Sequence, residues 1–252
     1  MTRVIMHGAC GYMGRVVTDI VAEDADMEIV AGIDPAGLEM PYPVFKTAAE
    51  CTVEADVIID FSTAAAIDSL LDFASEHSLP LVLCTTGLSE EQLGRVYEVS
   101  GSVPILRSAN MSLGINTIID LLNKATKVFG DAGFDVEIVE AHHSRKLDAP
   151  SGTAVALADA VNEAADGRYE YIYDRSQRRQ ARDKKELGIS AIRGGNIVGY
   201  HEVIFAGTDE VITLKHQATS RAVFARGAVE AARFLASRKP GMYDMADVIA
   251  SK

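Results

Sequence analysis

The N-terminal segment that decides the fold reads Arg3-Val4-Ile5-Met6-His7-Gly8-Ala9-Cys10-Gly11-Tyr12-Met13-Gly14. Its first residues are a short apolar run that is typical of a buried strand, and a helical pattern follows from about Tyr12 to Asp24. A second strand is expected over Met27–Ile33, ending at Asp34. A strand, a glycine-rich turn, a helix and a second strand form the βαβ unit with which dinucleotide-binding domains begin.

The glycines of this turn have the spacing G-x-x-G-x-x-G, which departs from the usual G-x-G-x-x-G. Gly8 and Gly11 would allow a tight turn and a close approach of the backbone to a pyrophosphate, and Gly14 would let the helix pack on the strand. An ordinary strand-to-helix turn is the alternative. The position of Asp34, twenty residues beyond Gly14, favours the cofactor site, because an acid at this distance binds the adenosine ribose.

Asp34 also bears on the choice of cofactor. A carboxylate repels the 2′-phosphate of NADPH by about 4 kcal/mol at about 4 Å, for an effective dielectric constant of about 20. An arginine or lysine nearby could offset this repulsion, but the sequence has neither between Val16 and Phe45. We therefore predict that the protein prefers NADH to NADPH.

The alternation of strands and helices continues, with strands expected over 55–61, 79–83 and 103–107. Ligands of an open parallel sheet bind outside the carboxyl ends of its strands. The strand ends at Phe61-Ser62, at Thr85-Thr86 and at Ala109-Asn110 should therefore line the cofactor cleft. Cys10 and Cys84 would lie near this cleft, and we interpret both as small buried residues without chemistry.

The pattern changes after Ser112, where we expect a long apolar helix to about Phe129 and a strand over 134–139. A polar segment over 168–185 is predicted to be an exposed loop. Its arginines, which we expect to be solvated or interfacial, are Arg168, Arg175, Arg178, Arg179 and Arg182.

Three strands joined by short turns, over 189–193, 197–206 and 210–217, are predicted to form an antiparallel meander. Together with the earlier strand they would make a mixed sheet with helices on one face, and its open face could support oligomers. A final apolar helix over 221–237 should pack on the first domain.

A second stretch carries the candidate chemistry, and it reads Glu140-Ala141-His142-His143-Ser144-Arg145-Lys146-Leu147-Asp148-Ala149-Pro150-Ser151-Gly152-Thr153. The histidines follow a strand, and Ser151 is the expected N-cap of a helix. The backbone amides at that helix start favour an anion. We predict a pocket for a small anion with titratable groups at its edge; ordinary solvated surface residues are the alternative. We expect no metal site, because adjacent histidines point apart on a strand and no further ligand has a suitable spacing.

Composition limits the class of protein. The 252 residues, 48% of them apolar, suffice for two domains, and no run is long enough to span a membrane. The chain enters a strand at once, without a signal peptide, and its three cysteines cannot form a closed disulfide framework. We therefore expect a cytoplasmic protein. Its net charge of −12 argues against nucleic acid as a partner, and nothing indicates membrane binding.

These two motifs, with Arg193-Gly194-Gly195-x-Ile197-Val198-Gly199-x-His201, resemble the bacterial 4-hydroxy-tetrahydrodipicolinate reductase family over the whole chain. The resemblance implies an α/β fold with an N-terminal Rossmann-like parallel sheet and an α+β mixed-sheet domain. It implies a dinucleotide-binding domain of residues 1–111 and 222–252, and a substrate-binding and oligomerisation domain of residues 112–221. It also implies a homotetramer that reduces a cyclic imine dicarboxylate, with loss of water, in diaminopimelate and lysine biosynthesis, using NADH or NADPH.

The resemblance also implies residue roles. His142 matches the family's catalytic proton donor or acceptor and Lys146 its proton donor, while His143, Gly152 and Thr153 match substrate-binding positions. The positions that match cofactor-binding residues are Gly8, Ala9, Cys10, Gly11, Tyr12, Met13, Asp34, Cys84, Thr85, Thr86, Ser108, Ala109, Asn110 and Met111.

Two departures from the family pattern stand out. Cys84 replaces a glycine that many members have, which puts the cofactor contacts there in doubt. Pro35 and Cys10 stand where many members have a basic residue, in agreement with a preference for NADH.

The residues alone are compatible with two other functions. One is a two-domain NAD-dependent dehydrogenase that acts on a different small acid. The other is an NADH-binding regulator without activity, although the chain has no DNA-binding motif and carries the wrong net charge for one.

Overall fold

The computed structural model describes all residues, 1–252, as two compact units. The first unit combines Met1–Ser112 with Ala222–Lys252, and the second unit is Leu113–Arg221. None of the helices has both the length and the apolar character that crossing a membrane requires.

The first unit is built on a parallel sheet of seven strands in the order β12-β6-β5-β4-β1-β2-β3. The strands are β1 (Thr2–His7), β2 (Met27–Ile33), β3 (Val44–Phe45), β4 (Val57–Asp60), β5 (Leu81–Leu83), β6 (Pro104–Leu106) and β12 (Gly241–Tyr243). The strand order reverses direction between β1 and β4, and such a switch point creates the crevice in which doubly wound sheets bind their ligands.

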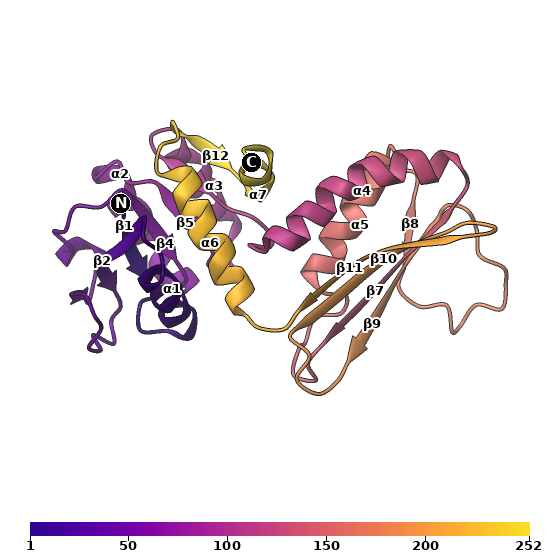
Figure 1. Ribbon diagram of the computed structural model, residues 1–252, viewed down its shortest axis with the longest axis horizontal. Coiled ribbons are helices and arrows are strands. Elements are labelled where there is room, and N and C mark those ends of the chain that lie inside the picture. Colours follow the sequence, from indigo (N-terminus) through magenta and orange to yellow (C-terminus); the bar gives the residue numbers. More distant parts are fainter. The chain divides into compact units, whose positions relative to one another are not determined.

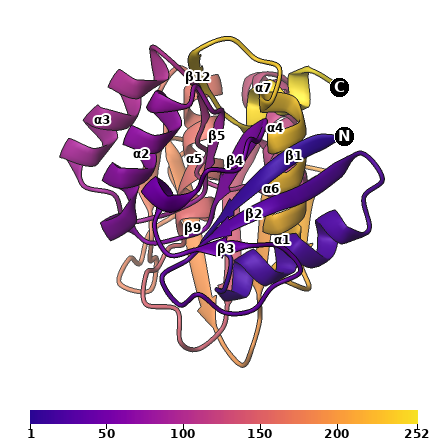
Figure 2. The same cartoon turned by 90° about the vertical axis from the view of Figure 1, so that its left-hand side faces the viewer.

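Helices cover both faces of this sheet, as Figure 2 shows. They are α1 (Tyr12–Ala22), α2 (Ile67–Glu76), α3 (Glu90–Ser100), α6 (Ala222–Leu235) and α7 (Met245–Ala250). α1 and α6 pack side by side on one face, and α2 and α3 pack on the other. The local sequence explains where α3 begins, because Ser89 and Gln92 form a capping box. The short elements β3, β12 and α7 escaped prediction, since two to six residues show too little periodicity.

The second unit contains a mixed sheet in the order β11-β10-β7-β9-β8. Its elements are α4 (Leu113–Asp131), β7 (Asp135–His142), α5 (Gly152–Ala164), β8 (Glu170–Ile172), β9 (Glu186–Arg193), β10 (Gly199–Ala206) and β11 (Val211–Ala218). α4 and α5 cover one face (Figure 1), where Val136, Ile138, Val203 and Phe205 are fully buried. The predicted fold class, a Rossmann-like parallel sheet with a separate mixed-sheet unit, is confirmed.

The predicted antiparallel meander is half right: β10 and β11 pair antiparallel as predicted, but the predicted pairing of β9 with β10 is wrong. β9 and β10 are not neighbours, because β7 lies between them and pairs in parallel with β9 and antiparallel with β10. The turn at Gly194-Gly195 looks like a hairpin in the sequence, but strand pairing depends on distant segments that local spacing does not show. This arrangement places Arg193 opposite His142 on one side of β7, and His201 opposite Glu140 on the other.

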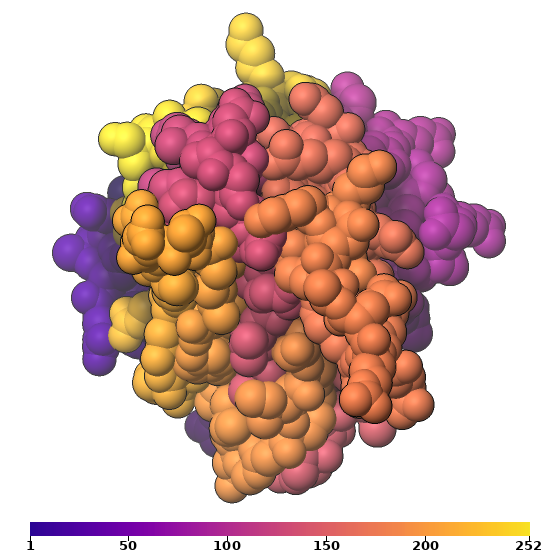
Figure 3. Space-filling model, turned by 90° about the vertical axis from the view of Figure 1, so that its right-hand side faces the viewer, coloured from indigo at the N-terminus to yellow at the C-terminus, as the bar shows by residue number.

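The predicted loop over 168–185 contains a short strand that was not predicted, β8, and only the rest of it is a loop. Three of its arginines form ion pairs, and one of these joins Arg178 to Glu186 at 3.1 Å. Arg182 binds Asp135 at 3.0 Å and Glu137 at 2.9 Å, both on β7, and its side chain is only 18% exposed. Arg175 binds Glu137 at 2.6 Å and also pairs with Glu186. Glu137 lies on the face of the sheet opposite α4 and α5, which is seen from outside in Figure 3. Sequence spacing could not reveal these pairs, because their carboxylates lie on strands distant in the chain.

Candidate active site

The glycine turn after β1 has the geometry that a dinucleotide requires. Gly8 has a φ of +81°, and a Cβ there would lie 2.6 Å from the Phe61 carbonyl oxygen. A Cβ on Gly14 would lie 2.3 Å from the Gly8 carbonyl oxygen, so both positions need glycine. Gly11 is the N-cap of α1, where no side chain caps the helix and no acid lies in the first turn. Such a helix start fits a pyrophosphate group.

The structure brings Asp34 to this turn. Its Oδ2 accepts a hydrogen bond from the Cys10 N–H at 2.9 Å, and its Oδ1 accepts one from the Ala36 N–H at 2.9 Å. Both carboxylate oxygens are therefore oriented by the backbone. This position beside the glycine turn suits an acid that meets a ribose of the cofactor.

Arg15 and Lys46 lie just before and just after the stretch of sequence that has no cation, and both side chains lie near the glycine turn and Asp34. The Arg15 Nε donates to the Cys10 carbonyl oxygen at 3.2 Å. The Lys46 Cε lies 3.7 Å from the position that a Cβ on Gly37 would take, in the turn after Asp34. The stretch without cations in the sequence is therefore flanked by positive charge in space.

The ends of the neighbouring strands meet beside the glycine turn. The hydroxyl groups of Ser62 and Thr85 lie 3.5 Å apart, and Asp60 Oδ1 accepts the Ser62 N–H at 3.1 Å and lies 2.7 Å from His7 Nδ1. Burial and nearby Asp60 raise the pKa of the Cys84 thiol well above its ordinary value. A thiol in this state is a poor nucleophile, which agrees with a packing role.

The remaining predicted cofactor residues, 108–111, follow β6 in the same unit. Met111, the last of them, packs against α6, because a Cβ on Gly227 would lie 1.6 Å from the Met111 carbonyl oxygen. The first unit thus gathers the predicted cofactor residues along the carboxyl ends of its strands.

The second unit places Glu140 and His142 together at the end of β7. Glu140 is fully buried, and its Oε2 lies 2.6 Å from His142 Nδ1. Arg193 donates to both carboxylate oxygens, at 2.7 and 2.9 Å, and the Ser151 N–H donates to Oε1 at 3.0 Å. Burial acts to raise the pKa of Glu140, but the hydrogen bonds from Arg193, His142 and Ser151 hold it below its ordinary value. The carboxylate is therefore ionised at neutral pH.

His201 packs against this pair from β10. Its ring makes a T-shaped contact with the His142 ring at 5.1 Å between centroids, and its Nε2 lies 3.1 Å from the Ser151 Oγ. Burial, followed by the nearby His142, lowers the pKa of His201 to about 4. His201 is therefore uncharged at neutral pH.

α5 begins at the predicted position, and Ser151 is its N-cap, accepting a hydrogen bond from the Ala154 N–H at 3.2 Å. Gly152 and Thr153 occupy the first turn, which holds no acid. His143 lies half-buried, and burial, followed by the charges of Arg145 and Arg221, lowers its pKa. These features make the region around the helix start electropositive.

Lys146 is held by Asp148, with 2.9 Å between Nζ and Oδ1, and this bond lowers the pKa of Asp148. The loop that carries both residues is anchored by Arg193, whose Nη2 donates to the Asp148 carbonyl oxygen at 2.6 Å. Arg145 lies at the surface and binds Asn196 at 3.0 Å. The structure therefore brings His142, His143, Lys146, Gly152 and Thr153 into one end of the second unit.

Sequence reasoning gave no role to Glu140, Arg193 or His201. One signal was available for the first, because residues two apart on a strand face the same side, so Glu140 had to lie beside His142. The contributions of Arg193 and His201 depend on the pairing of β7 with β9 and β10, which the predicted meander had wrong.

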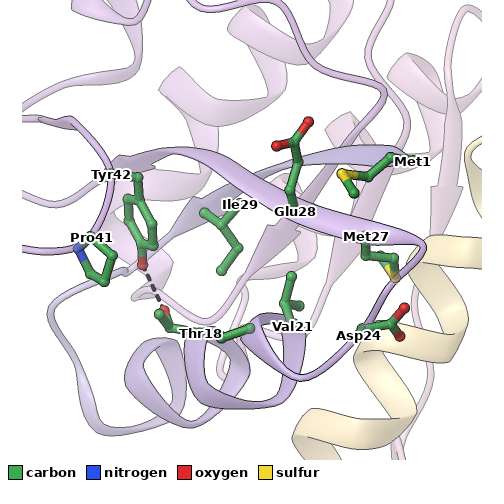
Figure 4. A pocket seen from close by; sticks show the side chains of 10 residues that line it. Met1, Thr18, Val21, Asp24, Met27, Glu28, Ile29, Pro41 and Tyr42 are labelled. Atoms are coloured by element: carbon green, nitrogen blue, oxygen red, sulfur yellow. Dashed lines mark hydrogen bonds between the residues drawn. The ribbon is translucent and has the colours of Figure 1, made fainter.

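A cavity of about 300 Å³ lies elsewhere in the first unit, between α1 and β2 (Figure 4). Val21, Met27 and Ile29 line it, and at one end the hydroxyl groups of Thr18 and Tyr42 lie 2.7 Å apart. It contains none of the predicted site residues. No cluster of three or more histidine, cysteine, aspartate and glutamate residues could hold a metal ion.

Comparisons with known proteins agree over the whole chain. Residues 2–111 match the family model described as dihydrodipicolinate reductase, N-terminus, and residues 114–249 match that of the C-terminus. A 4-hydroxy-tetrahydrodipicolinate reductase of Caldanaerobacter subterraneus subsp. tengcongensis is 50% identical over 249 residues, covering 99% of this chain and 98% of that protein. One of Clostridium botulinum is 47% identical over 251 residues, covering 99% and 98%. The structure of dipicolinate-bound dihydrodipicolinate reductase from Paenisporosarcina sp. TG-14 matches with a TM-score of 0.82 at 25% identity, covering 98% of this chain and 99% of that one.

Proposed function

The chain belongs to the dihydrodipicolinate reductase family, and we propose that it reduces 4-hydroxy-tetrahydrodipicolinate to tetrahydrodipicolinate, with loss of water, in diaminopimelate and lysine biosynthesis. One observation of the structure carries this proposal. A histidine oriented by a buried carboxylate, a lysine and a helix start without an acid in its first turn share one end of the second unit. Such a set can bind a dicarboxylate and supply a proton to it.

The first unit binds a pyridine nucleotide, in keeping with the N-terminal family match. When bound, the reduced nicotinamide supplies the hydride. The predicted residues fit this cofactor, because Gly8 and Gly14 allow the close backbone packing of a tight glycine turn, which a Cβ would prevent, and α1 begins without an acid. We assign Gly8–Met13 and Asp34 to its diphosphate and ribose, and Cys84–Thr86 and Ser108–Met111 to the neighbouring strand ends.

We further propose that NADH is preferred. The support is Asp34, whose carboxylate two backbone N–H groups hold beside the glycine turn. A 2′-phosphate there would meet this negative charge, whereas ribose hydroxyl groups can donate hydrogen bonds to it. Arg15 and Lys46 oppose this effect, so the measured preference reports the balance between one carboxylate and two cations.

The substrate residues divide into two roles. The backbone amides of Gly152 and Thr153, with His143, would bind the substrate carboxylates, because the first turn of α5 holds no acid and its N–H groups favour an anion. His142 and Lys146 would hold or supply the proton that the ring needs once it has been reduced. Proton donation by a positioned side chain contributes about 10²–10⁴ in rate.

We propose that the protein assembles as a homotetramer through the open face of the second unit. This face leaves Ile192 53% exposed and Val211 63% exposed, although both lie in regular strands. Apolar strand residues left uncovered in this way favour pairing with another copy. Sedimentation velocity of the purified protein gives the mass that tests this.

Steady-state reduction of freshly generated substrate with NADH and with NADPH tests the proposed function. Turnover of this substrate, with inhibition by pyridine-2,6-dicarboxylate, would support the reductase. Turnover only of another small acid would indicate a different dehydrogenase. Intact cofactor binding without any turnover would indicate a regulator.

A further inference from the structure

We propose that Glu140 is a positioning residue for His142: it holds the proton of the imidazole on Nδ1 and leaves Nε2 as the atom that exchanges a proton with the substrate. The inference rests on the proposed function, in which His142 moves that proton. It adds a third partner, Arg193, which keeps Glu140 ionised.

Glu140 and His142 form a hydrogen-bonded pair on β7. Glu140 and His142 are two residues apart on β7, so their side chains lie on the same face of the strand. The distance of 2.6 Å between Glu140 Oε2 and His142 Nδ1 is that of a short, charge-assisted hydrogen bond. An ionised carboxylate can only accept, so the proton of this bond belongs to Nδ1.

The protonation of His142 Nε2 follows from that of Nδ1. A neutral imidazole with its proton on Nδ1 has a lone pair on Nε2. In this structure no hydrogen bond of the protein engages His142 Nε2, and the side chain remains 11% exposed. The ring is thus anchored through one nitrogen and available through the other.

Arg193 determines the charge of Glu140. A fully buried carboxylate without a partner would take up a proton. Arg193 prevents this, because its guanidinium binds both oxygens and stays protonated at any ordinary pH. Its position is set by the β7–β9 pairing, which places Arg193 directly opposite His142.

Glu140 and Arg193 also connect the histidine to the substrate end of the site. Glu140 Oε1 accepts the N–H of Ser151, the residue that caps α5. Arg193 also binds the Asp148 carbonyl oxygen, in the loop that carries Lys146. One buried ion pair therefore sets the placement of His142 relative to both the helix start and the lysine.

Several other charged or titratable groups face His142 or lie close to it. They are His143 next to it in the chain, Arg193 on β9, His201 on β10, His216 beyond it on β11, and Lys146 in the loop. Of these, His201 is uncharged at neutral pH. Glu140 is the one carboxylate hydrogen-bonded to the ring, so it is the group whose removal should change how the ring is held and which nitrogen carries the proton.

The tautomer of His142 can be measured in the wild-type protein, without substrate. Nitrogen-15 NMR of histidine-labelled protein at pH 8 should show His142 protonated on Nδ1 and unprotonated on Nε2. The opposite tautomer would overturn the inference. Because this readout needs no turnover, it is separate from the proposed function, which fails if the wild-type protein does not reduce the substrate.

Replacing the carboxylate tests its role in turnover. Glu140→Gln should lower kcat by about 10²-fold or more, as expected when the partner that orients a catalytic histidine is lost. The KM for substrate should change by no more than about threefold, because binding groups are kept. The pH profile of kcat should also differ from that of the wild-type protein, because the negative charge beside the ring is lost.

Glu170→Gln is the matched control, because Glu170 is an exposed residue of β8 in the same sheet. Equal kcat values and pH profiles for the two glutamine variants would overturn the inference. If Glu140→Gln does not fold, the inference is tested by the activity of Glu140→Asp and by the tautomer of His142 in the wild-type protein. The aspartate variant keeps the charge and should be at least tenfold below wild type, with the Nδ1 proton retained; full activity in it would overturn the requirement for this placement.

Discussion

Arg193 lies opposite His142 across the β7–β9 pair, and both side chains bind the carboxylate of Glu140. The ion pair of Arg193 and Glu140 therefore affects both the stability of the second unit and the orientation of His142. An ion pair whose carboxylate is fully buried is costly to break, because the partner that remains is a charge without a counterion.

Arg193→Met should destabilise the protein by about 3–5 kcal/mol, since it leaves Glu140 buried without its cation. Urea unfolding at pH 7 measures this. Arg95→Met is the control, because Arg95 binds Asp68 and Asp72 at the surface, where such pairs contribute about 0–1 kcal/mol. Equal losses in the two variants would mean that Arg193 contributes no more than a surface pair.

His142→Gln and Lys146→Met, made separately, should each reduce kcat by about 10²-fold or more and leave NADH affinity unchanged. Both residues lie in the second unit, whereas the predicted cofactor residues lie in the first. Steady-state kinetics and NADH fluorescence titration give the two quantities. Near-normal turnover in both variants would show that neither residue moves the proton.

The ratio of kcat/KM for NADH to that for NADPH should exceed one in the wild-type protein. Asp34→Asn should raise kcat/KM for NADPH by about tenfold or more, because it removes the charge that repels the 2′-phosphate. A wild-type ratio below one would contradict the role given to Asp34.

Arg15→Ala tests the opposing cation at the same turn. Because the Arg15 guanidinium binds the carbonyl oxygen of Cys10, whose N–H binds Asp34, its removal should lower kcat/KM for NADPH more than for NADH. An equal loss for both cofactors would assign Arg15 to the folding of the turn and not to the choice of cofactor.

The pH dependence of stability should carry a contribution from His201. Its pKa in the folded protein is about 4, against about 6.5 in the unfolded chain, so the unfolded state binds more protons between these values. The free energy of unfolding should therefore fall as the pH drops from about 6.5 to 4, by up to about 3 kcal/mol.

His201→Gln should flatten that part of the curve, because glutamine does not titrate and can still accept the Ser151 hydroxyl group. Urea unfolding between pH 4 and pH 8 compares the two proteins. Parallel curves would show that His201 takes up its proton in the folded state as readily as in the unfolded chain.

Local features of the chain were predictable, and long-range ones were not. The turn at Gly8 and Gly14 and the cap at Ser151 depend on neighbouring residues, and the structure has both as predicted. The β10–β11 hairpin of the predicted meander is confirmed, but the β9–β10 pair was wrong, because whether β9 pairs with β7 or β10 depends on segments some fifty residues away.

The candidate site shows the same division. His142 and Lys146 stand in one recognisable motif, but the residues that orient them do not. Arg193 is fifty-three positions from Glu140, and only the sheet brings them together. The cations Arg15 and Lys46 were missed for a simpler reason, since a stretch of sequence without charge need not be a region of space without charge.

The first unit is assembled from two separated segments, and this affects how the protein folds as it is synthesised. β6 receives its outer neighbour, β12, only when Gly241–Tyr243 has been translated, more than 130 residues after β6 itself. All strands and helices of the second unit are translated before that point. At a synthesis rate of about 5–20 residues per second, the outer edge of β6 stays unpaired for several seconds or more. The second unit can therefore be fully translated while the first unit still lacks its last strand.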